Sequence, residues 1–433
     1  MRSFRLEEID AATFDGFSAR HPQGNFQQTS RMAEVRRRAG VEVRFLGVFE
    51  ADELVAATAL EAHRGRLSAF AQVHDGPLCD FHDAELTAFL FSELKRVARE
   101  AGAAQLEVTP EAPYEIRDSD GRELPESGPR PADVPEGAAS GPDVAAFRNI
   151  TACGLEHAGF DCTYNAVPRW RFVKDLAGIA DERALLASYA KNTRRNVNIA
   201  RESFVSVERV GRDRLPEYHA ICQLSCEKNG FENRPLAYFQ DLFDCLGDRA
   251  EVLIASIDLR AYLASWEAKR DAFAEKAERL EDQLRTPGHS AKVERRLADA
   301  REQLGGAERR VEEARGYLAK GGEVAAVAAA MFVWHERECV YLFSGSDPSY
   351  AKFCASTLIQ HQVMCECLAR GIERYNFYGI DGVFDDPNDP GRGLLLFKQG
   401  FGGYVEEMMG SFTLPVRPAA YAAKRLAHRI LGR

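Results

Sequence analysis

The apolar and polar positions of the first hundred residues follow the spacings of strands and helices in turn. The pattern predicts strands over 43–49 and 54–62, and a strand leading into a helix over 4–17. Two further stretches, 29–39 and 84–101, have the period of about 3.6 residues that is typical of amphipathic helices. This mixture indicates an α+β domain, layered so that helices pack on a sheet.

A segment rich in proline and glycine follows. Residues 110–142 contain seven of the chain's 18 prolines, which predicts a loop without regular elements. Helix signals resume near Ala145, and a strand over 170–173 opens what we interpret as a second domain. We therefore expect a first domain over 1–165 and a second domain over 166–416.

The stretch 261–320 has a different pattern, in which apolar residues step by three and four. Thr286-Pro287-Gly288 interrupts it, so the pattern predicts two helices joined by a short turn as an antiparallel coiled coil. At about 1.5 Å per residue each helix is roughly 40 Å long. Strand signals continue after it, over 324–333 and 340–344, so this arm (258–321) is expected to be inserted into the second domain. The seam residues are Leu263, Trp266, Arg270, Phe273, Ala277, Leu280 and Leu284, then Val293, Leu297, Ala300, Leu304, Ala307, Val311, Ala314 and Leu318.

The charge excludes a globally basic nucleic-acid binder, because 66 acidic residues outnumber 56 basic ones and the net charge is −10. A local basic patch lies on the helix predicted near residue 195 and fits either contact with a nucleic-acid backbone or a solvated helix face. The patch residues are Lys191, Arg194, Arg195 and Arg201.

The longest apolar run, 324–334, is about half of the ~20 residues that span a bilayer, and the N-terminus lacks the apolar core of a signal peptide.

Ten cysteines are scattered along the chain without a CxxC pair, which is typical of reduced thiols. His361 and Cys365 have the spacing of one helical turn, but no second pair completes a metal site. We expect no metal and no cofactor.

Several segments, in chain order, resemble the Fem (FemABX) family of aminoacyl-tRNA-dependent peptidyltransferases, which attach amino acids to peptidoglycan precursors. The resemblance covers about residues 20–416, with the arm where many members carry one. Three positions depart from the family pattern: Met32 replaces a Trp, Arg36 replaces a Lys, and Asn376 stands where an Asp is usual. The matching segments are Phe26-Gln27-Gln28-Thr29 with Arg36, residues 147–159 with 168–170 and 192–196, Gly230-Phe231 with Arg234 and Tyr238-Phe239, and 341–346, 375–380, 397–403 and 410–412.

The resemblance implies two acetyltransferase-like (GNAT) domains, with the arm inserted in the second and helping to hold tRNA. It implies an aminoacyl-tRNA donor and, as acceptor, the stem-peptide side-chain amine of lipid II or UDP-MurNAc-pentapeptide, so that the product is an interpeptide bridge. Such an enzyme would be cytoplasmic and peripheral to the inner face of the cytoplasmic membrane. Oligomeric state is not implied.

The resemblance also assigns roles to single residues. Lys398 matches a lysine implicated in catalysis and tRNA binding, and Arg36 and Arg234 match positions that bind diphosphate. Tyr238 could add its hydroxyl, and Tyr341 and Phe397 lie in matching segments assigned to substrate binding. Arg36 could equally belong to a solvated face, and Tyr238 could be a core aromatic residue.

The residues themselves fit a reaction without a covalent intermediate. The sequence has no Gly-x-Ser-x-Gly and no Walker loop, and aminolysis of an activated ester needs placement and oxyanion stabilisation more than a nucleophile. Lys398, expected to be an exposed cation beside the glycines of 400–403, can stabilise such charge. Asp381 could accept the amine's proton, or it could cap a turn.

The C-terminal residues 417–433 carry five Lys or Arg and no acid, with apolar residues along one face. This basic amphipathic helix could lie on an anionic membrane or dock on its own domain.

Two alternative functions stay open. An acyl-CoA N-acyltransferase of the same fold is one, because residues 399–403 faintly resemble a pyrophosphate loop. A non-catalytic protein that docks partners through its coiled coil is the other.

Overall fold

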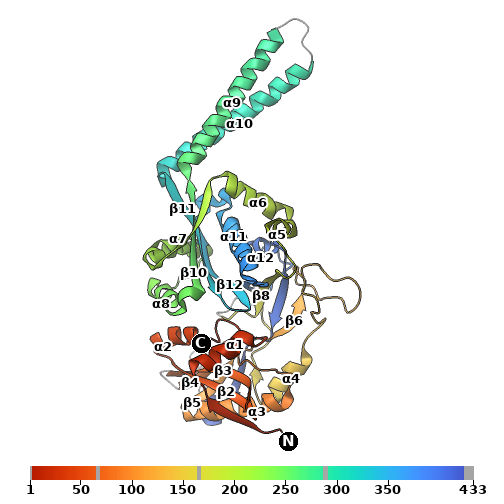
Figure 1. Ribbon diagram of the computed structural model, residues 1–433, viewed down its shortest axis with the longest axis vertical. Coiled ribbons are helices and arrows are strands. Elements are labelled where there is room, and N and C mark those ends of the chain that lie inside the picture. Colours follow the sequence, from red (N-terminus) through yellow and green to blue (C-terminus); the bar gives the residue numbers. More distant parts are fainter. Residues whose placement is uncertain (1, 65–68, 163–166, 286–290, 424–433) are drawn as a thin grey trace.

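Two mixed β-sheets follow one another along the long axis of the molecule, and a helical arm extends from the second (Figure 1). The computed structural model describes residues 2–64, 69–162, 167–285 and 291–423. The sheets, their helices and the arm confirm the predicted α+β fold with an inserted coiled coil.

The first sheet has seven strands. Helix α3 packs on it through Leu86, Leu90, Leu94 and Val97, and it begins where the side chain of Asp83 accepts a hydrogen bond from the backbone of Leu86. The strand order is β1 (Phe4–Glu8), β2 (Glu42–Glu50), β3 (Glu53–Arg64), β4 (Ala69–Val73), β5 (Ala103–Val108), β15 (Phe412–Pro415) and β7 (Glu156–His157). The helices are α1 (Ala11–Arg20), α2 (Ser30–Arg38), α3 (Ala84–Glu100) and α4 (Val144–Ala152).

The second sheet has eight strands and is covered on both faces. The strand order is β6 (Pro113–Arg117), β14 (Tyr404–Met408), β8 (Trp170–Asp175), β13 (Arg374–Ile380), β12 (Glu338–Ser346), β11 (Val324–Trp334), β10 (Ala250–Asp258) and β9 (Val205–Val210). The helices and 3-10 turns are α5 (Glu182–Ser188), α6 (Lys191–Glu202), η1 (Arg212–Arg214), α7 (Leu215–Asn229), α8 (Leu236–Leu246), η2 (Gly247–Arg249), η3 (Pro348–Phe353), α11 (Ala355–Arg370) and α12 (Arg392–Gln399).

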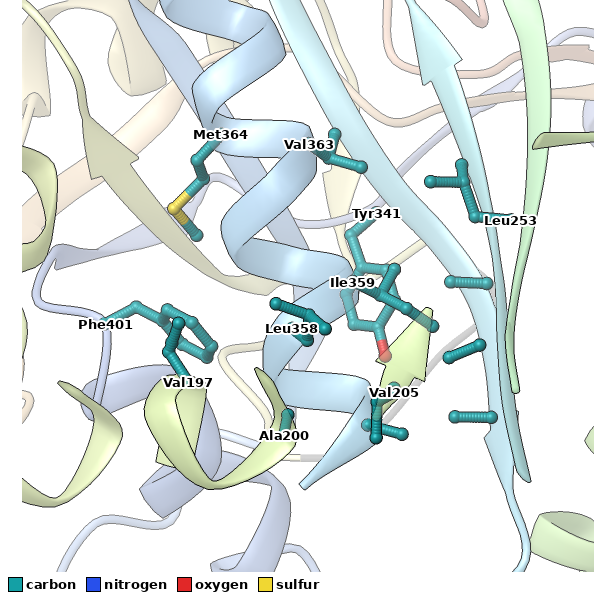
Figure 2. Packing of buried hydrophobic residues seen from close by; sticks show 14 of the residues in the cluster. Val197, Ala200, Val205, Leu253, Tyr341, Leu358, Ile359, Val363, Met364 and Phe401 are labelled. Atoms are coloured by element: carbon teal, nitrogen blue, oxygen red, sulfur yellow. The ribbon is translucent and has the colours of Figure 1, made fainter. Parts of the chain in front are cut away.

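Helices α6 and α11 pack on one face of this sheet. Figure 2 shows Ile359 of α11 beside Tyr341 of the sheet, and Leu358 on the side of α11 that faces Val197 of α6. Helices α7 and α8 cover the other face, and Phe26 and Met32 of the first domain join that second core. The two domains therefore share an apolar interface.

The chain crosses between the sheets twice. Strand β6 lies inside the segment predicted as a loop (110–142) but pairs with β14 of the second sheet, while β15 pairs with β5 and β7 of the first. Pro113 opens β6, and β6 is an edge strand, where the missing proline N–H does not break the sheet. Residue 165 therefore does not separate the two sheets.

The arm consists of α9 (Leu259–Arg285) and α10 (Ala291–Gly321). Seam residues such as Ala277, Leu280 and Ala300 are buried between the helices, as the spacing predicts. Because Asp258 of β10 pairs with Val324 of β11, the arm is an insertion between two neighbouring strands. Its turn, 286–290, lies outside the described residues.

Near the C-terminus, residues 418–423 are helical. Residues 424–433, which complete the predicted tail helix, lie outside the described residues.

Candidate functional site

Lys398 lies buried near the end of α12, against strand β13. Its Nζ donates hydrogen bonds to the carbonyl oxygens of Gly379, at 2.6 Å, and Tyr378, at 3.5 Å. Only 3% of the residue is exposed, so the expectation of an exposed cation is wrong. The physical reason is an irregular strand: Tyr378 has a φ of +62° and the register of β13 against β8 shifts there, so that two successive carbonyls turn toward Lys398.

Burial changes the chemistry of this lysine. It lowers the pKa of Lys398 to about 7, although the charge of Asp381 acts to raise it. Two carbonyls also leave one of the three ammonium N–H groups without a hydrogen-bond partner among the described residues. Such a group can stabilise developing negative charge or exchange a proton near neutral pH.

Asp381 and Asp389 meet across Gly391. A Cβ atom at Gly391 would lie 1.8 Å from Asp381 Oδ2 and 3.0 Å from Asp389 Oδ1, so only glycine fits between them. Burial and the hydrogen bond with Asp389 raise the pKa of Asp381. Asp381 Oδ1 also accepts a hydrogen bond from the backbone of Val383, at 3.4 Å, which is the turn-capping role. Its role as a proton acceptor stays a prediction.

Helix α6 begins against the turn that follows Lys398. The backbone of Ala190 donates to the carbonyl of Gly400 at 2.9 Å, and a Cβ at Gly400 would lie 2.3 Å from Thr193 Oγ1. Lys191 and Arg195 on this helix are exposed.

Within the described residues, no carboxylate forms an ion pair with Lys191, Arg194 or Arg195, whereas Arg201 pairs with Glu182 at 2.6 Å. We call Lys191, Arg194 and Arg195 the free cations of α6, because none has a carboxylate partner among the described residues; Arg194 donates only to the backbone carbonyl of Ala187, at 3.0 Å. They lie on the helix that begins against the residue-400 turn.

Arg36 is neither a solvated residue nor a free surface cation. Only 8% of it is exposed, and its guanidinium binds Glu61 at 2.6 Å and both the side-chain and backbone oxygens of Gln27. Burial lowers its pKa, against the charges of Glu61 and others. Glu61 also contacts His63 at 3.0 Å and lies 3.9 Å from His74.

We call Arg36, Glu61, His63 and His74 the Glu61 hub, because each of the other three lies within 4 Å of the Glu61 carboxylate. This cluster was not predicted from the sequence. Glu61 and His63 are two residues apart on β3 and therefore share a face, which is the signal that could have identified them.

Tyr238 connects two of the predicted arginines. Its ring is half-buried on α8, and the guanidinium of the exposed Arg234 lies 5.6 Å from the ring centroid. Burial raises the pKa of Tyr238, while the charges of Arg234 and Arg36 act to lower it. The structure thus brings Arg36, Arg234 and Tyr238 together where the first domain meets α8.

Tyr341 and Phe397 both belong to the core around the second sheet. Tyr341 is 9% exposed, and its hydroxyl donates to Ser344 at 2.5 Å. Phe397 is half-buried, with its ring 5.3 Å from that of Phe401. Phe397 is therefore the more accessible of the two for a ligand.

A second buried ion cluster, also not predicted, ties the two sheets together. Arg171 of β8 binds both oxygens of Glu111, at 2.6 and 2.7 Å, and Asp75 at 2.9 Å. Its guanidinium lies 5.7 Å from the ring of Tyr378, the residue whose carbonyl faces Lys398. Burial raises the pKa of Glu111 to about 8, against the charge of Arg171.

Two kinds of feature are not found in the part of the chain that the structure describes. No three His, Cys, Asp or Glu residues there are placed to hold a metal ion. None of its helices combines the length and apolar character that crossing a membrane requires.

Two helix-covered mixed sheets with a coiled-coil arm inserted between two strands of the second define an α+β protein. The chain belongs to the FemAB family, whose model matches residues 9–429. It is 23% identical to the aminoacyltransferase FemA of Staphylococcus aureus strain N315, and equally to that of strain COL, over 99% of both chains. Among solved structures, FemX has a TM-score of 0.73 at 20% identity, covering 97% of this chain and 99% of its own. That likeness confirms the fold.

Proposed function

We propose that the protein is an aminoacyltransferase that moves an amino acid from aminoacyl-tRNA to the stem-peptide side-chain amine of a peptidoglycan precursor, lipid II or UDP-MurNAc-pentapeptide. Membership of the FemAB family and the name of the relative FemA support the class of reaction. One observation carries the proposal in this chain: the free cations of α6 adjoin the turn that follows the buried Lys398.

The reaction is direct aminolysis of the tRNA ester, which builds the interpeptide bridge. The acceptor amine attacks the ester carbonyl, the carbon–oxygen bond to the tRNA breaks, and the ribose oxygen leaves as a hydroxyl group with the proton that the amine gives up. Lys398 stabilises the negative charge that develops on the carbonyl oxygen, and Asp381 accepts a proton from the attacking amine. Phe397 lies beside the reacting ends, and Lys191, Arg194 and Arg195 hold the tRNA backbone.

The acceptor's diphosphate binds at Arg234 and Tyr238. Arg234 is exposed and its guanidinium can bind phosphate oxygens in pairs. Arg36 does not bind the diphosphate itself, because Glu61 and Gln27 occupy its hydrogen-bond donors. It stabilises this subsite from the protein interior. Tyr341 belongs to the core and forms part of the wall of the substrate site.

The protein works at the inner face of the cytoplasmic membrane, where a lipid-linked acceptor is found. The basic segment 417–433 attracts anionic lipid with about 1 kcal/mol per Lys or Arg near the surface. Co-sedimentation with anionic vesicles at low salt, lost on truncation after Val416, is the expected result.

A donor-binding experiment tests the proposal against its alternatives. Equilibrium binding is measured for charged tRNA, for the same tRNA uncharged, and for acetyl-CoA. We expect saturable binding of charged tRNA that weakens with salt, and none of acetyl-CoA. Binding of acetyl-CoA alone would favour an acyl-CoA transferase, and binding of neither would favour a docking protein.

A further inference from the structure

The foot of the arm is held by a side chain of the second domain. Lys352, in turn η3, reaches Glu313 of α10, with 2.6 Å between Nζ and Oε1. Its Nζ is sealed from solvent. The same ammonium lies 4.6 Å from the ring centroid of Tyr317 and 5.6 Å from that of Tyr262, so it contacts both helices of the arm.

Further contacts close this cage. The ring of Phe353 lies 4.8 Å from the ammonium, and the Tyr317 hydroxyl donates to the carbonyl of Ser349 at 3.2 Å. Glu313 also accepts a hydrogen bond from Arg310 at 3.1 Å. The ammonium of Lys352 is buried with a carboxylate and aromatic faces around it and therefore has one preferred position. Moving the arm would separate the ion pair and leave the charge of Lys352 uncompensated, while Glu313 would keep Arg310 of its own helix.

The same turn contacts helix α6. Cys354 follows η3 in a left-handed conformation, with φ +54°. Burial raises the pKa of its thiol, while the nearby charge of Arg195 acts to lower it. In Figure 1, α6 lies at the same end of the second sheet as the foot of the arm. Turn η3 therefore lies between the arm and the helix that carries the free cations.

We propose that Lys352 is a positioning residue that fixes the direction of the arm relative to α6, so that both surfaces meet one RNA at a set angle. The part that concerns RNA rests on the proposed function. Leverage makes the angle matter: over a rod of about 40 Å, a tilt of about 10° displaces the tip by roughly 7 Å. A displacement of that size separates two contacts that one rigid RNA must make together.

Arm direction is measured first, without RNA. Spin labels on unnatural ketone residues at Glu278 of the arm and Lys228 of α7, both exposed, give a distance distribution by pulsed electron resonance. We expect a narrow distribution for the parent protein and a broad one for Lys352→Met and for Glu313→Gln. The double variant should be no broader than either single one. Lys320→Met is the matched control: it removes an exposed charge at the same foot, with one long hydrogen bond to Ser349 Oγ of η3 at 3.5 Å, and its distribution should stay narrow. A narrow distribution for Lys352→Met overturns the proposal.

Binding is measured second. Lys352→Met should weaken charged-tRNA binding about tenfold, part of the gain that two linked contacts provide, and leave UDP-linked precursor binding unchanged. A broad distribution with unchanged tRNA affinity contradicts the RNA part of the proposal. If the parent protein binds no tRNA at all, the proposed function fails, and the distance distribution still decides whether Lys352 fixes the arm.

Discussion

The ammonium of Lys398 lies 2.6 Å from the carbonyl oxygen of Gly379 inside the protein, and burial lowers its pKa to about 7. A lysine so placed costs stability when it is charged, because carbonyl dipoles replace only part of its hydration. Its position next to the free cations of α6 is the reason that we assign it to the reaction.

Replacing Lys398 with Met should therefore stabilise the fold and remove transfer. The folded pKa of about 7 lies below that of an unfolded lysine, so the unfolded chain binds more protons between these values. The stability of the parent protein consequently rises with pH from about 7 to about 10 and is flat below. We expect Lys398→Met to be more stable by about 1–3 kcal/mol at pH 7 or below, a gain that disappears toward pH 10.

Urea unfolding at several pH values checks this, with the exposed Lys228→Met as control. A loss of stability at pH 7, or near-normal transfer, would show that Lys398 is a structural residue.

The Arg36–Glu61 pair should behave as one unit. Arg36→Met leaves the buried Glu61 carboxylate without its main cation and should destabilise the fold by about 3–5 kcal/mol. The double variant Arg36→Met with Glu61→Met should recover most of this loss, as measured by urea unfolding. Additive losses in the double variant would contradict the pairing.

Acid should weaken the same hub. Burial acts to raise the pKa of Glu61, but the hydrogen bond from His63 and the charge of Arg36 lower it overall. A lowered folded pKa contributes stability above the unfolded value of about 4.3, which is lost as the pH falls through the folded pKa. We expect Glu61→Gln to reduce the steepness of acid unfolding below about pH 4, followed by circular dichroism.

Charge removal on α6 should act through salt dependence. Replacing Lys191, Arg194 and Arg195 by Ala together should weaken charged-tRNA binding and reduce the slope of log K against log salt by about 2–3. Arg201→Ala on the same helix is the control, because Arg201 already pairs with Glu182. An unchanged slope in the triple variant would exclude α6 from the RNA interface.

Deleting the arm should show whether it binds tRNA or supports the rest of the second domain. Removal of residues 264–318 with a short Gly/Ser closure should leave both sheets folded, because the arm has its own seam and inserts between paired strands. Scanning calorimetry should show a cooperative unfolding transition, and titration calorimetry should show weakened binding of charged tRNA with normal binding of the precursor. Equal weakening of both would show that the arm supports the rest of the domain.

Local patterns predicted the arm well and the buried charges poorly. Spacing by three and four specifies a coiled coil within each helix, so the sequence is sufficient. The crossing of β6 and β15 depends on pairing between residues 113–117 and 404–408, and between 103–108 and 412–415, which no local pattern records. Lys398 resembled a surface residue because glycines follow it, and only the bulge at Tyr378 explains its burial.

The most direct measurement is the mass of the acceptor after reaction. UDP-linked and lipid-linked precursors are incubated separately with the protein and a panel of individually charged tRNAs, and the products are weighed by mass spectrometry. We expect one precursor to gain the mass of a single amino-acid residue on its stem-peptide amine, with charged tRNA required and Lys398→Met inactive. No gain of mass with any charged tRNA, or a gain that acetyl-CoA alone supports, would contradict the assignment.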